Sequence, residues 1–339
     1  MKILLIGGTG TISMGISRRL SAEGHELFLL NRGNRDCGLK NVKCIAANIH
    51  DEKEVAQKLE GLSFDCAADF IAYTQEDLAR DFSLFNGRVK QFIFISSASA
   101  YQKPPVNHII TESTPLVNPF WEYSRNKAES ERFLMQKFRD EGFPVTIVRP
   151  SHTYDALKVP LAIHGKNGSF QVLKRMLEGK PVIIHGDGTS LWTMTHARDF
   201  ARGFCGLVGN PKAIGQSVQI MSEESMCWNQ IYDVIADALG VKLNAVHISS
   251  DFLCRADYLN LNLAGTLWGD KAWSVQFDTS KLRSLVPGFK AEISMASGIA
   301  ETVRNVAAHK ELQKPDEEFD LWCDRVIDFY SGMMNSFPF

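Results

Sequence analysis

The first 150 residues alternate short apolar segments with longer segments that have the spacing of amphipathic helices. The segments at 3–6 and 92–95 contain no polar residue, which is typical of strands buried on both faces. Strands separated by helices pair in parallel, because a crossover connection needs about the length of a helix. The sequence therefore predicts an α/β fold with a doubly wound parallel sheet, covered by helices on both faces.

The periodicity also places the individual elements. We expect strands at residues 3–6, 26–30, 42–46, 66–71, 91–96 and 145–149, and helices at 12–23, 52–59, 76–85 and 123–141. After Pro150 the loops lengthen and glycines cluster, with further helices expected at 170–177, 229–239 and 317–334. Residues 1–155 are therefore interpreted as one domain, which part of 195–225 rejoins. Residues 156–339 are interpreted mainly as a smaller domain over one edge of the sheet.

A glycine-rich turn joins the first expected strand to the first expected helix. Gly7-x-x-Gly10-x-x-Ser13 has the spacing and the context of a dinucleotide-binding turn. Gly7 permits the tight turn, and Gly10 lets the backbone approach a pyrophosphate at the helix N-terminus. Ser13 replaces the third glycine of this pattern, so we expect slightly wider helix–strand packing without loss of binding.

The end of the second strand bears on the choice of cofactor. An acidic residue there normally accepts a hydrogen bond from the adenosine ribose of NAD. This chain has Asn31 and Arg32 instead, with Arg35 close behind, and guanidinium groups pair well with a 2′-phosphate. The pattern favours NADP over NAD, although Arg32 could also stack on adenine or face solvent. Asn48 is a candidate for the adenine edge, or simply a turn residue.

Three side chains form a candidate catalytic group. Ser97 follows an expected strand, and Tyr123 lies one helical turn before Lys127. A second Tyr-x-x-x-Lys pattern, Tyr154 and Lys158, falls in an expected loop, where this spacing has no geometric meaning. We therefore assign the role to Tyr123.

The chemistry of these three residues suits proton transfer at an alcohol. We expect the Lys127 ammonium and an oxidised nicotinamide to lower the pKa of Tyr123, which then takes or gives the hydroxyl proton. Lys127 would also hold the nicotinamide ribose. Ser97 would bind and orient the reacting oxygen.

The combination of motifs resembles the extended short-chain dehydrogenases/reductases, specifically the NAD-dependent epimerase/dehydratase (nucleoside-diphosphate-sugar epimerase) family. The matching segments are Gly7-Gly8-Thr9-Gly10-Thr11-Ile12, residues 92–101, Tyr123-Ser124-Arg125-Asn126-Lys127, Val148-Arg149-Pro150, and the run from Gly186 to Asp199. The resemblance implies a Rossmann-type NAD(P)-binding domain, a C-terminal substrate domain, and catalytic Ser97, Tyr123 and Lys127. Cofactor contacts are further expected at Thr11, Ile12 and Phe70, and substrate contacts at Ser97, Ser99 and Trp192.

One departure from the family pattern concerns the substrate. Trp192 stands where sugar-nucleotide enzymes usually carry an arginine that pairs with the substrate diphosphate. An indole cannot form that pair, although it could stack on a base or a sugar, or belong to the core. His196 and Asp199 fit the family motif and are interpreted as the start of a helix with its cap.

These observations predict an NAD(P)-dependent enzyme that acts on a secondary alcohol as an epimerase, dehydratase or reductase, and a sugar or nucleotide-sugar is the candidate substrate. Two alternatives stay open. One is an NADP-dependent reductase of a small carbonyl compound, and the other is a non-catalytic nucleotide-sensing or RNA-associated protein on the same fold.

The composition limits the classes of partner that we expect for this protein. A formal net charge of −2 argues against nucleic acid, and no apolar run reaches the ~20 residues of a membrane span. The seven scattered cysteines suit a cytoplasmic protein, and neither cysteines nor histidines have metal-ligand spacing. We expect a small-molecule substrate, no metal, and a homodimer that pairs through the helices at 76–85 and 123–141, as the family resemblance implies.

Overall fold

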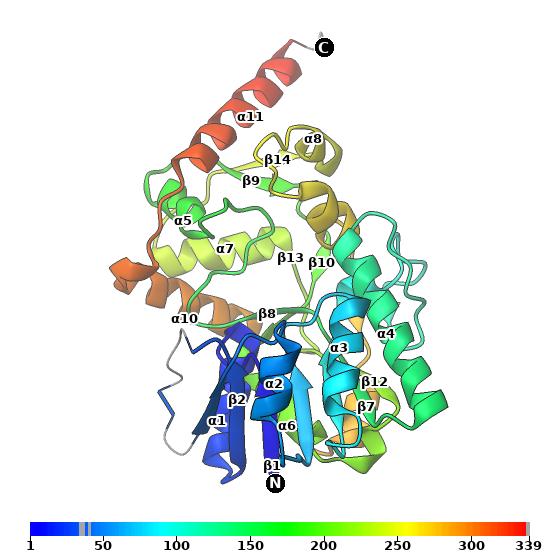
Figure 1. Cartoon of the computed structure of the whole chain (residues 1–339). Helices are drawn as coiled ribbons and strands as arrows, with labels where there is room; N and C mark the ends of the chain where they lie inside the picture. The colour runs from blue at the N-terminus through cyan, green and yellow to red at the C-terminus, as the bar shows by residue number, and fades with distance from the viewer. Residues whose placement is uncertain (34–37, 40–41, 337–339) are drawn as a thin grey trace.

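A seven-stranded parallel sheet forms the centre of the first half of the chain (Figure 1). The computed structural model describes residues 1–33, 38–39 and 42–336. The strand order is β3-β2-β1-β4-β5-β7-β12, which reverses direction of winding beside β1 and confirms the predicted doubly wound Rossmann-type sheet. The strands are β1 (Lys2–Ile6), β2 (Glu26–Asn31), β3 (Val42–Ala46), β4 (Cys66–Asp69), β5 (Phe92–Ile95), β7 (Val145–Pro150) and β12 (Gln216–Ile220).

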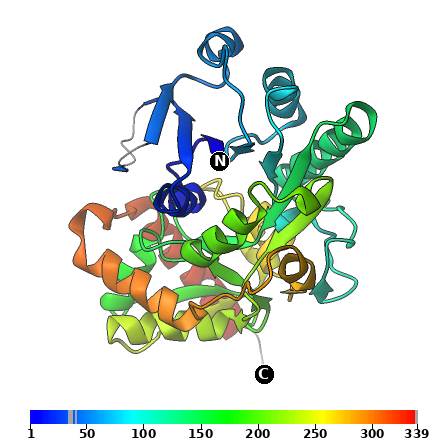
Figure 2. The same ribbon diagram turned by 90° about the horizontal axis from the view of Figure 1, so that it is seen from below.

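Helices cover both faces of this sheet (Figure 2). On one face lie α1 (Thr11–Ala22) and α6 (Ala197–Leu207), and on the other α2 (Glu52–Lys58), α3 (Gln75–Phe85) and α4 (Glu122–Glu141). Strand β1 contributes side chains to the cores on both faces of the sheet. Ile3 and Leu5 pack into the core on the α1 face, whereas Leu4 and Ile6 pack into the core on the α2 face. This alternation explains why β1 is apolar throughout.

The remaining elements surround a third core, built largely from the C-terminal half. The helices here are α5 (Phe170–Leu177), α7 (Trp228–Leu239), α8 (Ser250–Arg255), α10 (Met295–Ala308), α11 (Glu317–Asn335), a π-helix (Ala264–Lys271) and short 3₁₀ turns at Ala98–Ala100 and Lys310–Leu312. Helix α9 (Ser280–Leu285) and the 3₁₀ turn Pro211–Ala213 pack instead into the core on the α1 side of the sheet. Four strand pairs complete the fold: β6 (Ile109–Ile110) with β15 (Gln276–Phe277), β8 (His152–Tyr154) with β11 (Met194–His196), β9 (Val182–His185) with β14 (Ala245–Ile248), and β10 (Leu191–Trp192) with β13 (Met226–Cys227).

Two local expectations were wrong. The strand expected at 66–71 ends at Asp69, because the Asp69 carboxylate accepts hydrogen bonds from the amides of Ile71 (2.5 Å) and Ala72 (2.7 Å) and turns the chain. Tyr154 lies in strand β8 instead of a loop, because its segment pairs in parallel with β11. Both outcomes depend on an interaction that the local apolar pattern does not show: the hydrogen bonds of the Asp69 side chain in the first case, and pairing with β11 in the second.

None of the helices in the described part of the chain has both the length and the apolar composition of a membrane span.

Helices α3 and α4 pack beside one another on the same face of the sheet. The pairing of these two helices with a second copy of the chain stays a prediction.

Helix α1 approaches α6 closely at Gly15, a contact that the sequence pattern did not reveal. A Cβ at Gly15 would lie 3.1 Å from the backbone oxygen of Ala197 and 3.6 Å from the Cβ of Ala201. The neighbouring Ser13, which replaces the third motif glycine, is buried, and its hydroxyl accepts a hydrogen bond from the Gly10 amide at 2.9 Å. The tight packing of this helix therefore depends on Gly15.

Gly15→Val should lower the free energy of unfolding by ~1–3 kcal/mol, the cost of overpacking a tight contact. Gly332→Val in α11 is the matched control, because a Cβ there meets no atom within 4 Å. Urea denaturation of both variants is the measurement. Equal stability of the two variants would show that α1 and α6 separate without cost.

Candidate active site

The glycine-rich turn after β1 has the backbone that the sequence predicted. Gly7 and Gly8 adopt positive φ values of 106° and 76°, a region that favours glycine. A Cβ on Gly8 would also lie 2.6 Å from the Cδ2 of Leu29. Gly10 then caps the N-terminus of α1 in an extended conformation. The turn thus brings bare backbone to the carboxyl end of the sheet.

A cleft of about 740 Å³ opens beside this turn and is called the large cleft below. Its volume lies within the roughly 300–1,000 Å³ that small-molecule and cofactor sites occupy. Six of the predicted cofactor residues line it: Gly7, Gly10, Asn31, Arg32, Asn48 and Phe70. The lining also includes Thr9, Ser13, Leu30, Ala47, Ile49, His50, Ile71, Tyr73 and Asp77. A helix N-terminus, a glycine turn and no carboxylate at the end of β2 fit a dinucleotide with a phosphate near Arg32.

The other predicted cofactor residues lie elsewhere. Thr11 is exposed at the first turn of α1, and Ile12 packs against the core on the α1 face, so neither lines the large cleft. Arg35 lies outside the described residues. Arg32 itself is exposed, and the Asn31 side chain accepts a hydrogen bond from the Gly33 amide at 2.8 Å.

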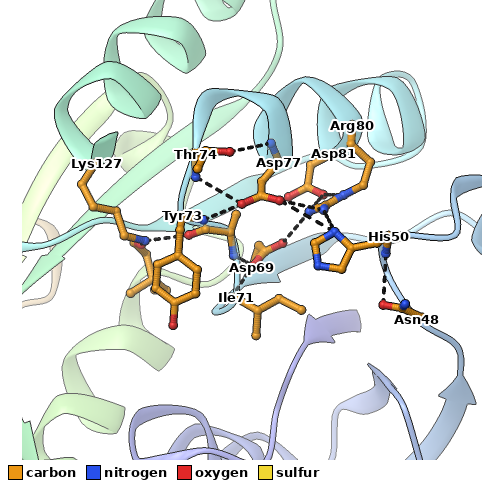
Figure 3. Close-up of polar contacts among 12 residues, drawn as sticks. Asn48, His50, Asp69, Ile71, Tyr73, Thr74, Asp77, Arg80, Asp81 and Lys127 are labelled. Carbon is orange, nitrogen blue, oxygen red and sulfur yellow. Dashed lines mark hydrogen bonds and ion pairs between the residues drawn. The ribbon is translucent and has the colours of Figure 1, made fainter. Parts of the chain in front are cut away.

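A buried charge network supports the wall of the large cleft (Figure 3). The Arg80 guanidinium donates to Asp81 at 2.7 and 2.9 Å and to Asp77 at 3.0 Å, and lies 3.9 Å from Asp69. Burial, together with the neighbouring Asp69, raises the pKa of Asp81 well above its usual range. The protonated form of the Asp81 carboxyl is therefore favoured beside the Arg80 guanidinium.

This network holds the turn that follows β4. Asp69 fixes the amides of Ile71 and Ala72, while Asp77 accepts hydrogen bonds from the amides of Tyr73 (2.9 Å) and Thr74 (3.1 Å). The turn is thereby tied at both ends, and it presents Ile71 and Tyr73 to the large cleft. The sequence analysis missed these acidic residues, because only the fold brings the end of β4 and helix α3 together.

Ser97 and Tyr123 meet at the carboxyl end of β5. Ser97 caps the short turn Ala98–Ala100, and its hydroxyl lies 2.9 Å from that of Ser99. Burial raises the pKa of the Tyr123 phenol to about 12, an effect that a hydrogen bond with Ser97 only partly offsets. Ser97 and Tyr123 line the same cavity, and at neutral pH the phenol keeps its proton.

Lys127 lies one turn along α4 from Tyr123, with its charge enclosed. Its Nζ donates to the backbone oxygens of Ala72 (2.7 Å) and Ile95 (2.8 Å), and it lies 5.7 Å from the centre of the Tyr123 ring. Burial lowers the pKa of Lys127 to about 8. The expectation that Lys127 lowers the pKa of Tyr123 was therefore wrong for this arrangement, because the removal of the phenol from water outweighs the distant ammonium.

A second buried ion pair lies behind the catalytic group. Arg149 binds Glu131 of α4 through three contacts of 2.6, 2.9 and 3.1 Å, and Ser96 donates to the same carboxylate at 2.5 Å. All three side chains are buried. The pair joins the ends of β5 and β7 to α4, and so sets the position of Ser97 relative to Tyr123.

A cavity of about 240 Å³, called the small cavity below, lies on the other side of Tyr123. Its lining includes the predicted Ser97, Ser99 and Tyr123. The other lining residues, which the sequence analysis missed, are Ala98, Trp121, Pro150, Ser151, His152, Asp270 and Lys271. Asp270 and Lys271 follow Tyr123 by almost 150 residues, and no local motif links them to it.

Known proteins resemble this chain in sequence and in fold. The sequence matches the model of the NAD dependent epimerase/dehydratase family over residues 77–220. It is 23% identical over 294 residues to a 2'-dehydrokanamycin reductase of Streptomyces kanamyceticus, which covers 86% of this chain and 80% of that protein. Residues 77–220 are therefore similar to the NAD-dependent epimerase/dehydratase family.

Two further proteins resemble the chain, one in sequence and one in fold. The chain is 25% identical over 253 residues to the chloroplast stem-loop binding protein of 41 kDa b of Arabidopsis thaliana, and the match covers 70% of this chain and 63% of that protein, less than two thirds of its length. Among solved structures, the dTDP-glucose 4,6-dehydratase of Bacillus anthracis in complex with NAD superposes with a TM-score of 0.72 at 17% identity, over 92% of this chain and 98% of that one. The latter likeness shows the shared fold.

The remaining predicted residues lie outside both the large cleft and the small cavity. Trp192 is buried and stacks on Trp228 at 5.8 Å, away from the small cavity. Tyr154 is buried beside His196, and its hydroxyl has no hydrogen-bond partner in the described part of the chain. His196 caps α6 through its Nδ1, and Asp199 accepts hydrogen bonds from two backbone amides, as structural residues do.

Arg149→Met should lower the free energy of unfolding by ~3–5 kcal/mol, because it leaves the Glu131 carboxylate buried without its partner. The double variant Arg149→Met/Glu131→Leu should lose less than Arg149→Met alone, since no buried charge then remains. Urea denaturation of the single and double variants measures both effects. A double variant that is less stable than Arg149→Met would contradict this account.

Proposed function

We propose that this protein is an NAD(P)-dependent oxidoreductase that interconverts a ketone and a secondary alcohol in the small cavity. One observation carries the proposal: Tyr123 lines the small cavity, and the centre of its ring lies 6.0 Å from that of Tyr73, which lines the large cleft. The phenol therefore stands between the two sites. A nicotinamide bound in the large cleft would supply or accept the hydride.

The side chains favour the reductive direction. Tyr123, with its pKa raised to about 12, is a proton donor at neutral pH, and Ser97 beside it is placed to hydrogen-bond a carbonyl oxygen. As the carbonyl carbon gains a hydride, its oxygen takes the phenol proton, and a secondary alcohol results. The Lys127 ammonium lies 5.7 Å from the centre of the Tyr123 ring, and at that distance it offsets the phenolate charge only in part. The relative named as a reductase supports this direction.

A non-catalytic nucleotide-sensing or RNA-associated role has one supporting observation, the similarity to the chloroplast stem-loop binding protein. The net charge of −2 supports the enzyme instead, because RNA binding relies on a basic excess. The enclosed serine, tyrosine and lysine beside a second cavity support it as well, since nucleotide sensing alone needs no proton donor there.

Tyr123→Phe should reduce turnover ~10²–10⁴-fold, the range for loss of a general acid, and should leave nucleotide binding unchanged. NADPH oxidation with a panel of cyclic ketones, including 2'-dehydrokanamycin, measures turnover, and calorimetry measures binding. Tyr154→Phe is the control, because it removes a hydroxyl that has no hydrogen-bond partner among the described residues. An inactive Tyr154→Phe beside an active Tyr123→Phe would refute the assignment.

For the cofactor, we propose a preference for NADP, supported by Arg32 at the large cleft and by the absence of a carboxylate at the end of β2. Arg32→Ala should weaken NADP binding about tenfold, the lower end for an arginine–phosphate pair because Arg32 is exposed, and should leave NAD binding unchanged. Calorimetric titration of both nucleotides is the measurement, with the exposed Arg255→Ala as control. Equal losses for the two nucleotides would mean that Arg32 stacks on adenine.

A further inference from the structure

The small cavity is lined by charges of both signs, Asp270 and Lys271, which act on each other electrostatically. Asp270 and Lys271 stand at the end of the π-helix Ala264–Lys271, and both line the cavity. Within the described residues, neither side chain forms a hydrogen bond or an ion pair of 4 Å or less. Lys271 is only 8% exposed, so its ammonium lacks full hydration as well. Buried charges are costly without partners, which points to a ligand that supplies them.

The backbone that carries these two side chains is, by contrast, firmly held. The Lys271 oxygen accepts hydrogen bonds from His185 (3.1 Å), Trp228 (3.2 Å) and Ser190 (3.3 Å). The preceding oxygen, that of Gly269, accepts one from Asn118 at 2.7 Å.

The same segment is also joined to the catalytic residues. The Asn118 amide donates a second hydrogen bond, to the oxygen of Ser99, and a Cβ on Gly269 would lie 2.8 Å from the Cβ of Trp121. The segment is therefore built into the same wall as the Ser97–Ser99 turn. A rigid backbone with unpaired side chains is the expected form of a binding site that is set before its ligand arrives.

Both charges act on groups beside the cavity. Asp270 acts electrostatically on the Tyr123 phenol, and Lys271 acts on His152 and has its Nζ 5.9 Å from the centre of the buried Trp192 ring. Burial lowers the pKa of His152 to about 3, so that its ring is neutral. Trp192 is thus a neighbour of the lysine ammonium and is not among the residues that line the cavity. A ligand in the cavity meets a carboxylate that acts on Tyr123, an ammonium, and neutral polar side chains.

Hydroxyl groups match this pattern, since each one both donates and accepts hydrogen bonds. A diphosphate matches it less well, because Asp270 would repel the anion, Lys271 alone would attract it, and no described lining residue is an arginine. The volume of about 240 Å³ also falls below the roughly 300 Å³ at which sites for drug-sized ligands begin.

We propose that Asp270 and Lys271 select a compact, uncharged, polyhydroxylated ring, a free sugar or cyclitol, and exclude sugars attached to a nucleoside diphosphate. One ring hydroxyl donates to Asp270, and another accepts from Lys271. This proposal rests on the proposed function, because the ring carries the alcohol or ketone that faces Tyr123.

Saturation-transfer NMR on the full chain with NADP tests the proposal. The probes are D-glucose, D-galactose, D-mannose and myo-inositol on one side, and UDP-glucose and dTDP-glucose on the other. At least one free ring should bind, and neither nucleotide sugar should. Asp270→Asn and Lys271→Met should each weaken ring binding about 10–100-fold, the effect of losing a hydrogen bond to a charged group, with NADP affinity unchanged. Thermal denaturation confirms folding, and the exposed Lys290→Met is the control for Lys271→Met.

Binding of a nucleotide sugar, binding of no free ring, or unchanged affinity in both variants would each overturn the proposal. The test separates it from the proposed function. Turnover of a nucleotide sugar that depends on Tyr123 would keep the function and refute the ring selectivity. A ring that binds through Asp270 and Lys271 but never exchanges hydride with the nucleotide would refute the function and keep the site.

Discussion

The two hydrogen bonds of the Lys127 ammonium are the interaction on which the rest of the site depends. They join helix α4 to the oxygen of Ala72, in the turn after β4, and to the oxygen of Ile95, at the end of β5. Because the carboxyl ends of parallel strands meet at one edge of the sheet, one side chain reaches both. Tyr73, Tyr123 and Ser97 are thereby held around the same point, with the large cleft on one side and the small cavity on the other.

Buried charge is the means by which this edge of the sheet is made rigid. Arg80 lies among Asp69, Asp77 and Asp81, and Arg149 is paired with Glu131. Each group loses its hydration, so that its partners must stay in place for the fold to be stable. The only lining charges without such partners among the described residues of the small cavity are Asp270 and Lys271. Charges held in hydrogen-bonded ion pairs thus belong to the scaffold, whereas Asp270 and Lys271 belong to the surface for which we propose a ligand.

Much of the fold followed from local patterns. The doubly wound sheet is evident in the apolar strands and the helical spacing between them, and Gly7, Gly10, Ser97, Tyr123 and Lys127 stand in an order that this sheet requires. The errors have one kind of cause. β4 ends early because the Asp69 side chain captures two amides, and Tyr154 enters a strand because β11 pairs with it. Each outcome depends on a partner that the local pattern does not contain.

The sequence by itself determined the parallel sheet, the glycine turn at its edge, and the order of Ser97, Tyr123 and Lys127 along the chain, because these depend on short-range spacing and on the geometry of a strand followed by a helix. Only the tertiary structure decided the surroundings of Tyr123. Burial raises the pKa of this phenol, whereas the expected effect of Lys127 and an oxidised nicotinamide was the opposite. Trp192 lies in the core, while Asp270 and Lys271 line the small cavity although they follow Tyr123 by almost 150 residues. The pKa of Tyr123 and the positions of these side chains depend on solvation and on contacts between distant segments, and a short segment of sequence determines neither.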